Sequence, residues 1–261
     1  MSLTGKTLSG SYKDILQVDN SNNGVTTSLK QIKDGEGTAS ALNISDDNVR
    51  IVPNNDDSTT TLQVRTNSGS QVLAVDTTNQ LVTASGNIVN TQYAHFGISN
   101  AESNFVANTH HALPFGFSYS AEIYPPNFGT GTDPATTFTT SSASGYNADE
   151  LAICLWYLFD PIRIDAIRVF QGADQATGDT NRFHLMSYDF TSGATNSLTN
   201  GTLLAHSADT DNEGYEQSYL SSAWTIDSAA VASGKVVLAF LECDTIVSDY
   251  AVNVQIKYHL T

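Results

Sequence analysis

The stretch that decides the fold lies at the end of the chain and reads Tyr250-Ala251-Val252-Asn253-Val254-Gln255-Ile256-Lys257-Tyr258-His259-Leu260. Apolar residues fill every second position, and the positions between them are small or polar. Because successive side chains of a β-strand point to opposite faces, this strict alternation predicts one long strand with a single face on a core.

Two upstream segments carry related signals. Residues 235–241 form a nearly continuous apolar run, which is typical of a central sandwich strand buried on both faces. Residues 162–165 begin an alternating strand, and the alternation changes phase at Ala166-Ile167. A phase change of this kind predicts a β-bulge at that point.

Further strands complete a C-terminal domain over residues 149–261. Residues 182–188 predict one strand, and shorter strands are expected at 203–204 and 217–220. The apolar run 151–159 is compatible with a strand or a buried helix, and its length and the Asp160-Pro161 stop favour the strand. The set of about seven strands fits a jelly-roll-like β-sandwich.

Residues 1–92 read as a slender β-meander of short strands separated by polar turns, of which Asn23-Gly24 is a strong example. Each strand carries only two or three apolar side chains, so the meander buries little surface on its own. Two arrangements remain open. Three copies could wind around one shared core, or the meander could pack on the rest of its own chain.

Residues 93–148 predict an aromatic-rich connector followed by a polar loop of Thr, Ser, Gly and Ala. The fold class expected for the whole chain is therefore all-β: a slender N-terminal β-meander region followed by a jelly-roll-like β-sandwich. We expect helix in less than about a tenth of residues, against the usual third.

Composition restricts the classes of function. Charged residues make up only 15% of the chain and the net charge is −16, which argues against nucleic-acid binding because phosphate contacts need gathered Lys and Arg. Four of the six lysines, at positions 6, 13, 30 and 33, fall in the first eighth of the chain. No apolar signal-peptide core opens the sequence and no apolar run spans a bilayer, so we expect synthesis in a cytoplasm and no membrane insertion.

Motifs for chemistry are weak, and we expect no enzyme activity, cofactor or metal. His110-His111 offers one metal ligand at most, because adjacent strand side chains point apart. Residues 209–214 imitate the start of a calcium loop, but the closing acidic position is Leu220, which favours a solvated acidic turn. Asp174 and Asp179 flank a turn and form the one candidate carboxylate pair for glycan hydrolysis.

The cysteines Cys154 and Cys243 each lie inside an apolar segment without a neighbouring cluster of metal ligands. Buried free thiols are the expected state, and a long-range disulfide stays open as the alternative.

Residues 12–25, with the string Tyr-Lys-Asp-Ile-Leu-Gln-Val-Asp-Asn-Ser-Asn-Asn-Gly-Val, and residues 33–42, with Lys-Asp-Gly-Glu-Gly-Thr-Ala-Ser-Ala-Leu, resemble a module of structural proteins from marine and cyanobacterial tailed phages. Those proteins are tail fibres or virion appendage proteins, and the resemblance covers about residues 6–52. It implies a homotrimer located on the virion, in contact with tail, portal or capsid proteins. A host surface glycan or protein is a further candidate partner.

These observations lead to one expected function and two alternatives. We expect a non-enzymatic virion structural protein, a short trimeric fibre attached by its N-terminus with the C-terminal domain facing the host or the solvent. The alternatives are a capsid decoration or head-fibre protein and, more distantly, a glycan-degrading enzyme. The residues expected to attach the chain to the particle are Lys6, Tyr12, Lys13, Leu16 and Val18.

Overall fold

The computed structural model describes residues 12–101, 106–116, 128–140, 151–175, 180–211, 214–221, 224–244 and 250–261. Strands hold 52% of the residues and helices 2%, so the all-β prediction and the low helix content are confirmed. The chain divides into two compact units, Met1–Val89 and Asn90–Thr261. Each unit is described by itself.

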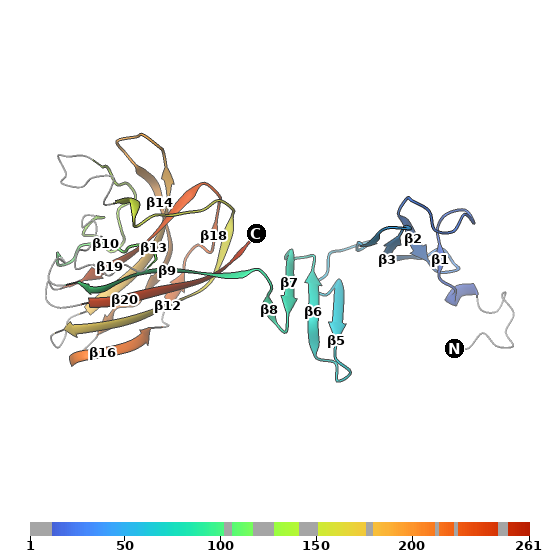
Figure 1. Ribbon diagram of the computed structural model, residues 1–261, viewed down its shortest axis with the longest axis horizontal. Helices are drawn as coiled ribbons and strands as arrows, with labels where there is room; N and C mark the ends of the chain where they lie inside the picture. Colours follow the sequence, from blue (N-terminus) through green and yellow to red (C-terminus); the bar gives the residue numbers. More distant parts are fainter. Residues whose placement is uncertain are drawn as a thin grey trace. The chain divides into compact units, whose positions relative to one another are not determined.

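The first unit contains two four-stranded antiparallel sheets in which each strand pairs with the next along the chain (Figure 1). A short 3-10 helix η2 (Tyr12–Asp14) precedes them. The first sheet consists of β1 (Gln17–Val18), β2 (Lys30–Lys33), β3 (Ala39–Ile44) and β4 (Val49–Ile51). The second consists of β5 (Leu62–Arg65), β6 (Gln71–Asp76), β7 (Leu81–Ala84) and β8 (Asn87–Ile88). The meander prediction is therefore correct for both sheets.

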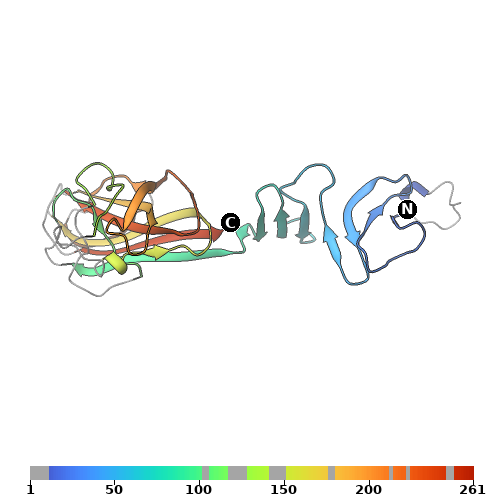
Figure 2. The same cartoon turned by 90° about the horizontal axis from the view of Figure 1, so that it is seen from above.

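The second unit is a sandwich of two antiparallel sheets, seen face-on in Figure 1 and from above in Figure 2. The five-stranded sheet has the order β16-β12-β20-β9, with β18 also pairing with β12. Its strands are β9 (Thr91–Ala101), β12 (Ile162–Gln175), β16 (Gly214–Ser221), β18 (Ala230–Val231) and β20 (Tyr250–Leu260).

The seven-stranded sheet has the order β10-β19-β13-β14-β17, with β11 added to β19 and β15 to β13. Its strands are β10 (His111–Ala112), β11 (Trp156–Tyr157), β13 (Thr180–Phe190), β14 (Leu198–Ser207), β15 (Thr210–Asp211), β17 (Trp224–Ile226) and β19 (Lys235–Cys243). Several consecutive strands cross from one sheet to the other, as from β9 to β10 and from β12 to β13.

The main core lies between the two sheets and follows from the alternation in the sequence. In β20, Val252, Val254 and Ile256 are buried, while Gln255 and Lys257 on the opposite face are only partly covered. The predicted bulge in β12 is present, because the register with β20 shifts between Ile164 and Ala166. Side chains of β9, β12 and β20 meet those of β13, β14 and β19 in one hydrophobic cluster.

The seven-stranded sheet is buried on both faces, as the continuous apolar run of β19 predicts. Val237, Ala239 and Leu241 point into the core between the sheets, and the intervening residues join a second cluster on the outer face. Irregular segments cover that outer face with four side chains, Phe128, Phe138, Leu151 and Cys154. Tyr188 anchors the cover, since its hydroxyl donates a hydrogen bond to the Ala135 carbonyl at 2.9 Å.

Two segments differ from expectation. Residues 93–101, predicted as connector, belong to β9, which pairs with β20 along nearly its whole length. In the run 151–159 only Trp156 and Tyr157 form a strand, and residues 151–154 form a tight helical turn. This turn buries Leu151 and Cys154 against the seven-stranded sheet. Residues of the run 151–159 are therefore apolar where they pack on a sheet face, although the run forms neither a full strand nor a helix.

Candidate functional site

The residues predicted to attach the chain to a particle lie at the start of the first unit. Tyr12 and Lys13 form part of η2, and the Lys13 ammonium lies 2.5 Å from a carboxylate oxygen of Glu36. Leu16 is 71% exposed, and Val18 pairs with Ile32 at the edge of the first sheet. Lys6 lies outside the described residues. The other four residues lie close together in the sequence, and their role in attachment stays a prediction.

The first sheet carries exposed aliphatic side chains on one face. The register pairs Leu42 with Ile51 and Ile44 with Val49, which places all four side chains on one face. Leu42, Val49 and Ile51 are 38%, 70% and 37% exposed. Between them lie polar positions, such as Asn43 paired with Arg50, which face the other way.

The second sheet repeats this pattern. Val64 pairs with Leu73 and Val75 pairs with Val82, so strands β5, β6 and β7 contribute aliphatic side chains to a common face. Leu62 on the same face pairs with Val75. Val64 is 49% and Val82 41% exposed.

Almost no hydrophobic core exists inside this unit. Among residues 12–89, Ile32 and Ala74 are the only buried hydrophobic side chains. Small sheets need a covered hydrophobic face to be stable in water. These two aliphatic faces are here called the meander faces and are defined by Leu42, Ile44, Val49, Ile51, Leu62, Val64, Leu73, Val75 and Val82.

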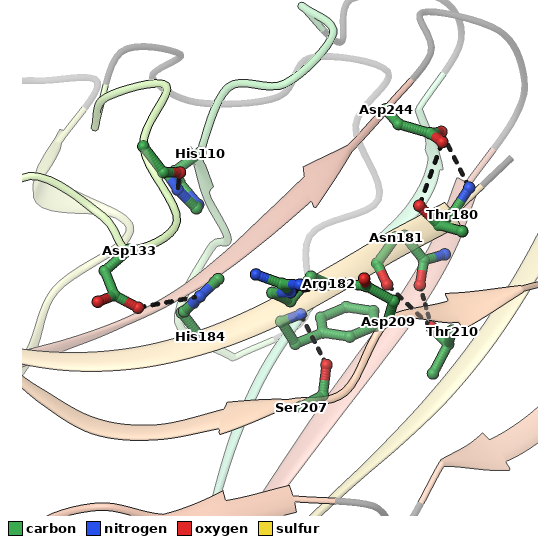
Figure 3. A network of polar contacts seen from close by, with 12 residues as sticks. His110, Asp133, Thr180, Asn181, Arg182, His184, Ser207, Asp209, Thr210 and Asp244 are labelled. Atoms are coloured by element: carbon green, nitrogen blue, oxygen red, sulfur yellow. Dashed lines mark hydrogen bonds and ion pairs between the residues drawn. The ribbon is translucent and has the colours of Figure 1, made fainter.

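A polar pocket of about 400 Å³ lies in the second unit, beside the first residues of β13 (Figure 3). Thr180, Asn181 and Arg182 come from β13 and Glu242 from β19, and neighbouring loops complete the wall. The loop residues are Asn108, Thr130, Gly131, Thr132, Asp209 and Asp244. Hydroxyl, amide and carboxylate groups line this pocket, so it suits a small hydrophilic ligand.

Two of the three acidic groups that line the pocket, Asp209 and Asp244, already hold protein partners. Arg182 donates from both Nε and a terminal nitrogen to the same oxygen of Asp209, each at 2.6 Å. Asp244 accepts from the Thr180 amide at 2.9 Å and from its hydroxyl at 3.1 Å. Asp209 lies in the segment 209–214, which imitates the start of a calcium loop. In the structure its carboxylate forms an ion pair with Arg182. Within the described ranges, no three His, Cys, Asp or Glu side chains gather in a way that could hold a metal ion.

Buried histidines lie next to this pocket. The rings of His110 and His184 meet edge to face with centroids 4.8 Å apart, and His184 Nε2 lies 3.7 Å from Asp133. Burial lowers the pKa of His184 to about 3 and that of His111 to about 4, so both rings are neutral at physiological pH. His110 and His111 share no ligand geometry, because each ring contacts a different segment: His110 bonds the Gly131 carbonyl, and His111 faces Val106.

The remaining predicted chemistry can be placed in part. Cys154 and Cys243 are both buried, and burial raises the pKa of the Cys154 thiol to about 12. The side chains of Asp174 and Asp179 lie outside the described part of the molecule. The pocket residues were missed by sequence reasoning, apart from Asp209 itself, because no local motif links them.

No protein-family model and no curated protein matches this chain. In the described part of the molecule, no helix has the length and apolar character that a membrane crossing requires.

Proposed function

We propose that this chain is a non-enzymatic structural protein of a bacteriophage virion, a short homotrimeric fibre or appendage. The N-terminal unit attaches to the particle, and the C-terminal sandwich faces the host or the solvent. The phage assignment rests on the resemblance of residues 6–52 to virion appendage modules. The sandwich is proposed to be a jelly roll, which the strand orders β16-β12-β20-β9 and β10-β19-β13-β14 support.

The observation that carries the proposal is the pair of exposed meander faces. Over its described residues, 12–89, the first unit has only Ile32 and Ala74 as buried hydrophobic side chains, so it would gain most of its apolar burial from other chains. Copies of the same chain supply matching aliphatic faces, and closed symmetry lets three such faces meet around one axis. The sandwich needs no such help, since its two clusters are complete within one chain.

The polarity of attachment follows from the same contrast. Leu16 is 71% exposed, so this end presents an uncovered apolar group, and Lys13, three residues earlier, forms an exposed ion pair with Glu36. Exposed ion pairs contribute only about 0–1 kcal/mol each, so attachment needs several such contacts multiplied over the copies of an oligomer.

Deletion of residues 1–40 tests the proposal. The truncated chain should keep its C-terminal fold, seen as an unchanged near-UV circular dichroism spectrum, and should fail to join particles. Labelled copies of the full chain should appear on virions in electron micrographs in tens or fewer per particle. Normal loading of the truncated chain would make the sandwich the anchor, and hundreds of copies over the shell would favour the capsid-decoration alternative.

A further inference from the structure

The outer face of the five-stranded sheet carries a regular array of side chains that point away from the core. Along β20, four residues on this face, at positions 253, 255, 257 and 259, have a neighbour on β9 and on β12, and His259 among them is buried. Lys257 pairs with Tyr93 and Ala166, and Gln255 pairs with His95 and Arg168. The next two rows are Asn253 with Gly97 and Phe170, and His259 with Thr91 and Arg163. Figure 1 shows β9, β20 and β12 side by side in this order.

Unpaired positive charge collects on this face. The second unit contains five basic residues, and two of them are neutralised: Arg182 by Asp209 and Lys235 by Asp189. The other three are Arg163, Arg168 and Lys257. All three lie on the outer face, and among the described residues none of them has a carboxylate partner within 4.0 Å.

The spacing of the charges is wide and regular. Arg163 and Arg168 are both exposed and lie on one strand, with one extra residue at the bulge between them. At about 3.3 Å per residue their backbone positions lie roughly 13 Å apart. Lys257 lies on the neighbouring strand in a row between them.

Exposed aromatic rings flank the cationic array. Tyr93 is 62% exposed on β9, and Phe170 is 45% exposed on β12. Tyrosine presents an apolar ring face together with a hydroxyl, which suits contact with the C–H face and the hydroxyl groups of a sugar. The amide of Gln255 lies between the two rings and supplies a further donor and acceptor.

We propose that this outer face binds an acidic polysaccharide, a chain of sugars with a carboxylate or sulfate on each sugar or disaccharide. The assignment rests on the proposed function, because it gives the outward-facing unit of the appendage its ligand. Arginine forks recognise carboxylate and sulfate oxygens, and sparse anions match widely spaced cations. Duplex DNA carries a charge every 1.7 Å or so, a density that a chain of net charge −16 with three bases on this face does not neutralise.

Binding of the purified full chain to immobilised polymers tests the proposal by biolayer interferometry. The probes are dextran sulfate, alginate, neutral dextran and a duplex DNA oligonucleotide. We expect binding to dextran sulfate, alginate or both, which also identifies the anionic group. We expect no binding to dextran. Binding to the acidic polymers should weaken as salt rises from 50 to 500 mM, because salt screens the attraction between exposed charges.

Matched double variants locate the site. Arg163→Gln with Arg168→Gln should weaken binding about tenfold, because two exposed charge contacts contribute roughly 0–1 kcal/mol each. Arg50→Gln with Arg65→Gln removes the same charge from exposed arginines of the first unit and should leave binding within about twofold of the native value. Tyr93→Ala should weaken binding severalfold without changing its salt dependence. Unchanged melting temperatures confirm that the variants are folded.

Three results would overturn the proposal: no binding to either acidic polymer, equal effects of the two double variants, or DNA binding as tight as glycan binding. The oligomeric state is measured on the same samples by light scattering. A trimer that ignores acidic polymers refutes the glycan assignment alone. A monomer that binds them through Arg163 and Arg168 refutes the trimeric appendage alone.

Discussion

The substitution Val64→Asp examines whether the meander faces meet in an oligomer. Val64 lies on β5, is 49% exposed and shares its face with Leu73. In a single chain a carboxylate at this position remains solvated, so the unit loses little. In an oligomer the same carboxylate must leave water, or the faces must separate.

The magnitude follows from the exposed fraction. Complete burial of a valine side chain contributes about 1.5–3 kcal/mol, so covering the exposed half of Val64 contributes roughly 1 kcal/mol per chain. Three copies together lose about 3 kcal/mol, and a tenfold change in an equilibrium constant corresponds to about 1.4 kcal/mol. The trimer association constant should therefore fall by at least about a hundredfold, and the cost of burying carboxylates adds to this loss.

Sedimentation velocity over a range of protein concentrations measures the effect. The matched control is Val72→Asp, because Val72 is 43% exposed on the same sheet but points to the opposite face from Leu73. We expect the control to keep the native mass and Val64→Asp to dissociate at micromolar concentration. A native chain that sediments as a monomer, or two variants that behave alike, would refute the reasoning.

Three further predictions concern the sandwich. Gly201→Ala should lower the melting temperature, because an added Cβ would lie 2.6 Å from Tyr188 Cε1 and 2.8 Å from the backbone Cα of Thr136, and overpacking of this kind costs about 1–3 kcal/mol. Stability should fall as pH drops from 6.5 to 4, since His111 and His184 have pKa values of about 4 and about 3 when folded and take up their protons earlier when unfolded. Each histidine should contribute on the order of 3 kcal/mol to the loss over this window, so denaturant titrations of His111→Gln should show a loss smaller by about that amount. Cys154 should react with a thiol reagent only on unfolding, as followed by absorbance, because burial raises its pKa to about 12.

Periodicity was sufficient to predict the strands whose two faces differ strongly. The alternation in residues 250–260 indicates a strand buried on one face. The apolar run in residues 235–241 indicates a strand buried on both faces. β9 was missed although Ala94, Phe96 and Ile98 alternate in it. Its outward positions include the exposed aromatic Tyr93, which blurs the contrast between faces, so the segment resembled an irregular connector.

The sites could not be predicted in the same way because they depend on register between distant strands. Arg163, Arg168 and Lys257 share a face only because β12 pairs with β20 and shifts by one residue at the bulge. Arg182 on β13 and Asp209 in the segment between β14 and β15 are likewise brought together by strand pairing. A single sequence carries no signal for such pairings, whereas the scarcity of apolar residues in the meander strands can be read directly and indicates that burial must come from elsewhere.

The difference in burial between the two units predicts the order in which they become stable during assembly. The sandwich closes its clusters within one chain, so its folding free energy does not depend on concentration. The described part of the first unit has Ile32 and Ala74 as its buried hydrophobic side chains, so in the proposed oligomer its stability would rise with association by mass action. In the proposed appendage the sandwich therefore folds first and the N-terminal unit becomes stable as copies meet. Attachment through residues near Leu16 then becomes multivalent only after assembly, which disfavours the docking of single chains on a particle.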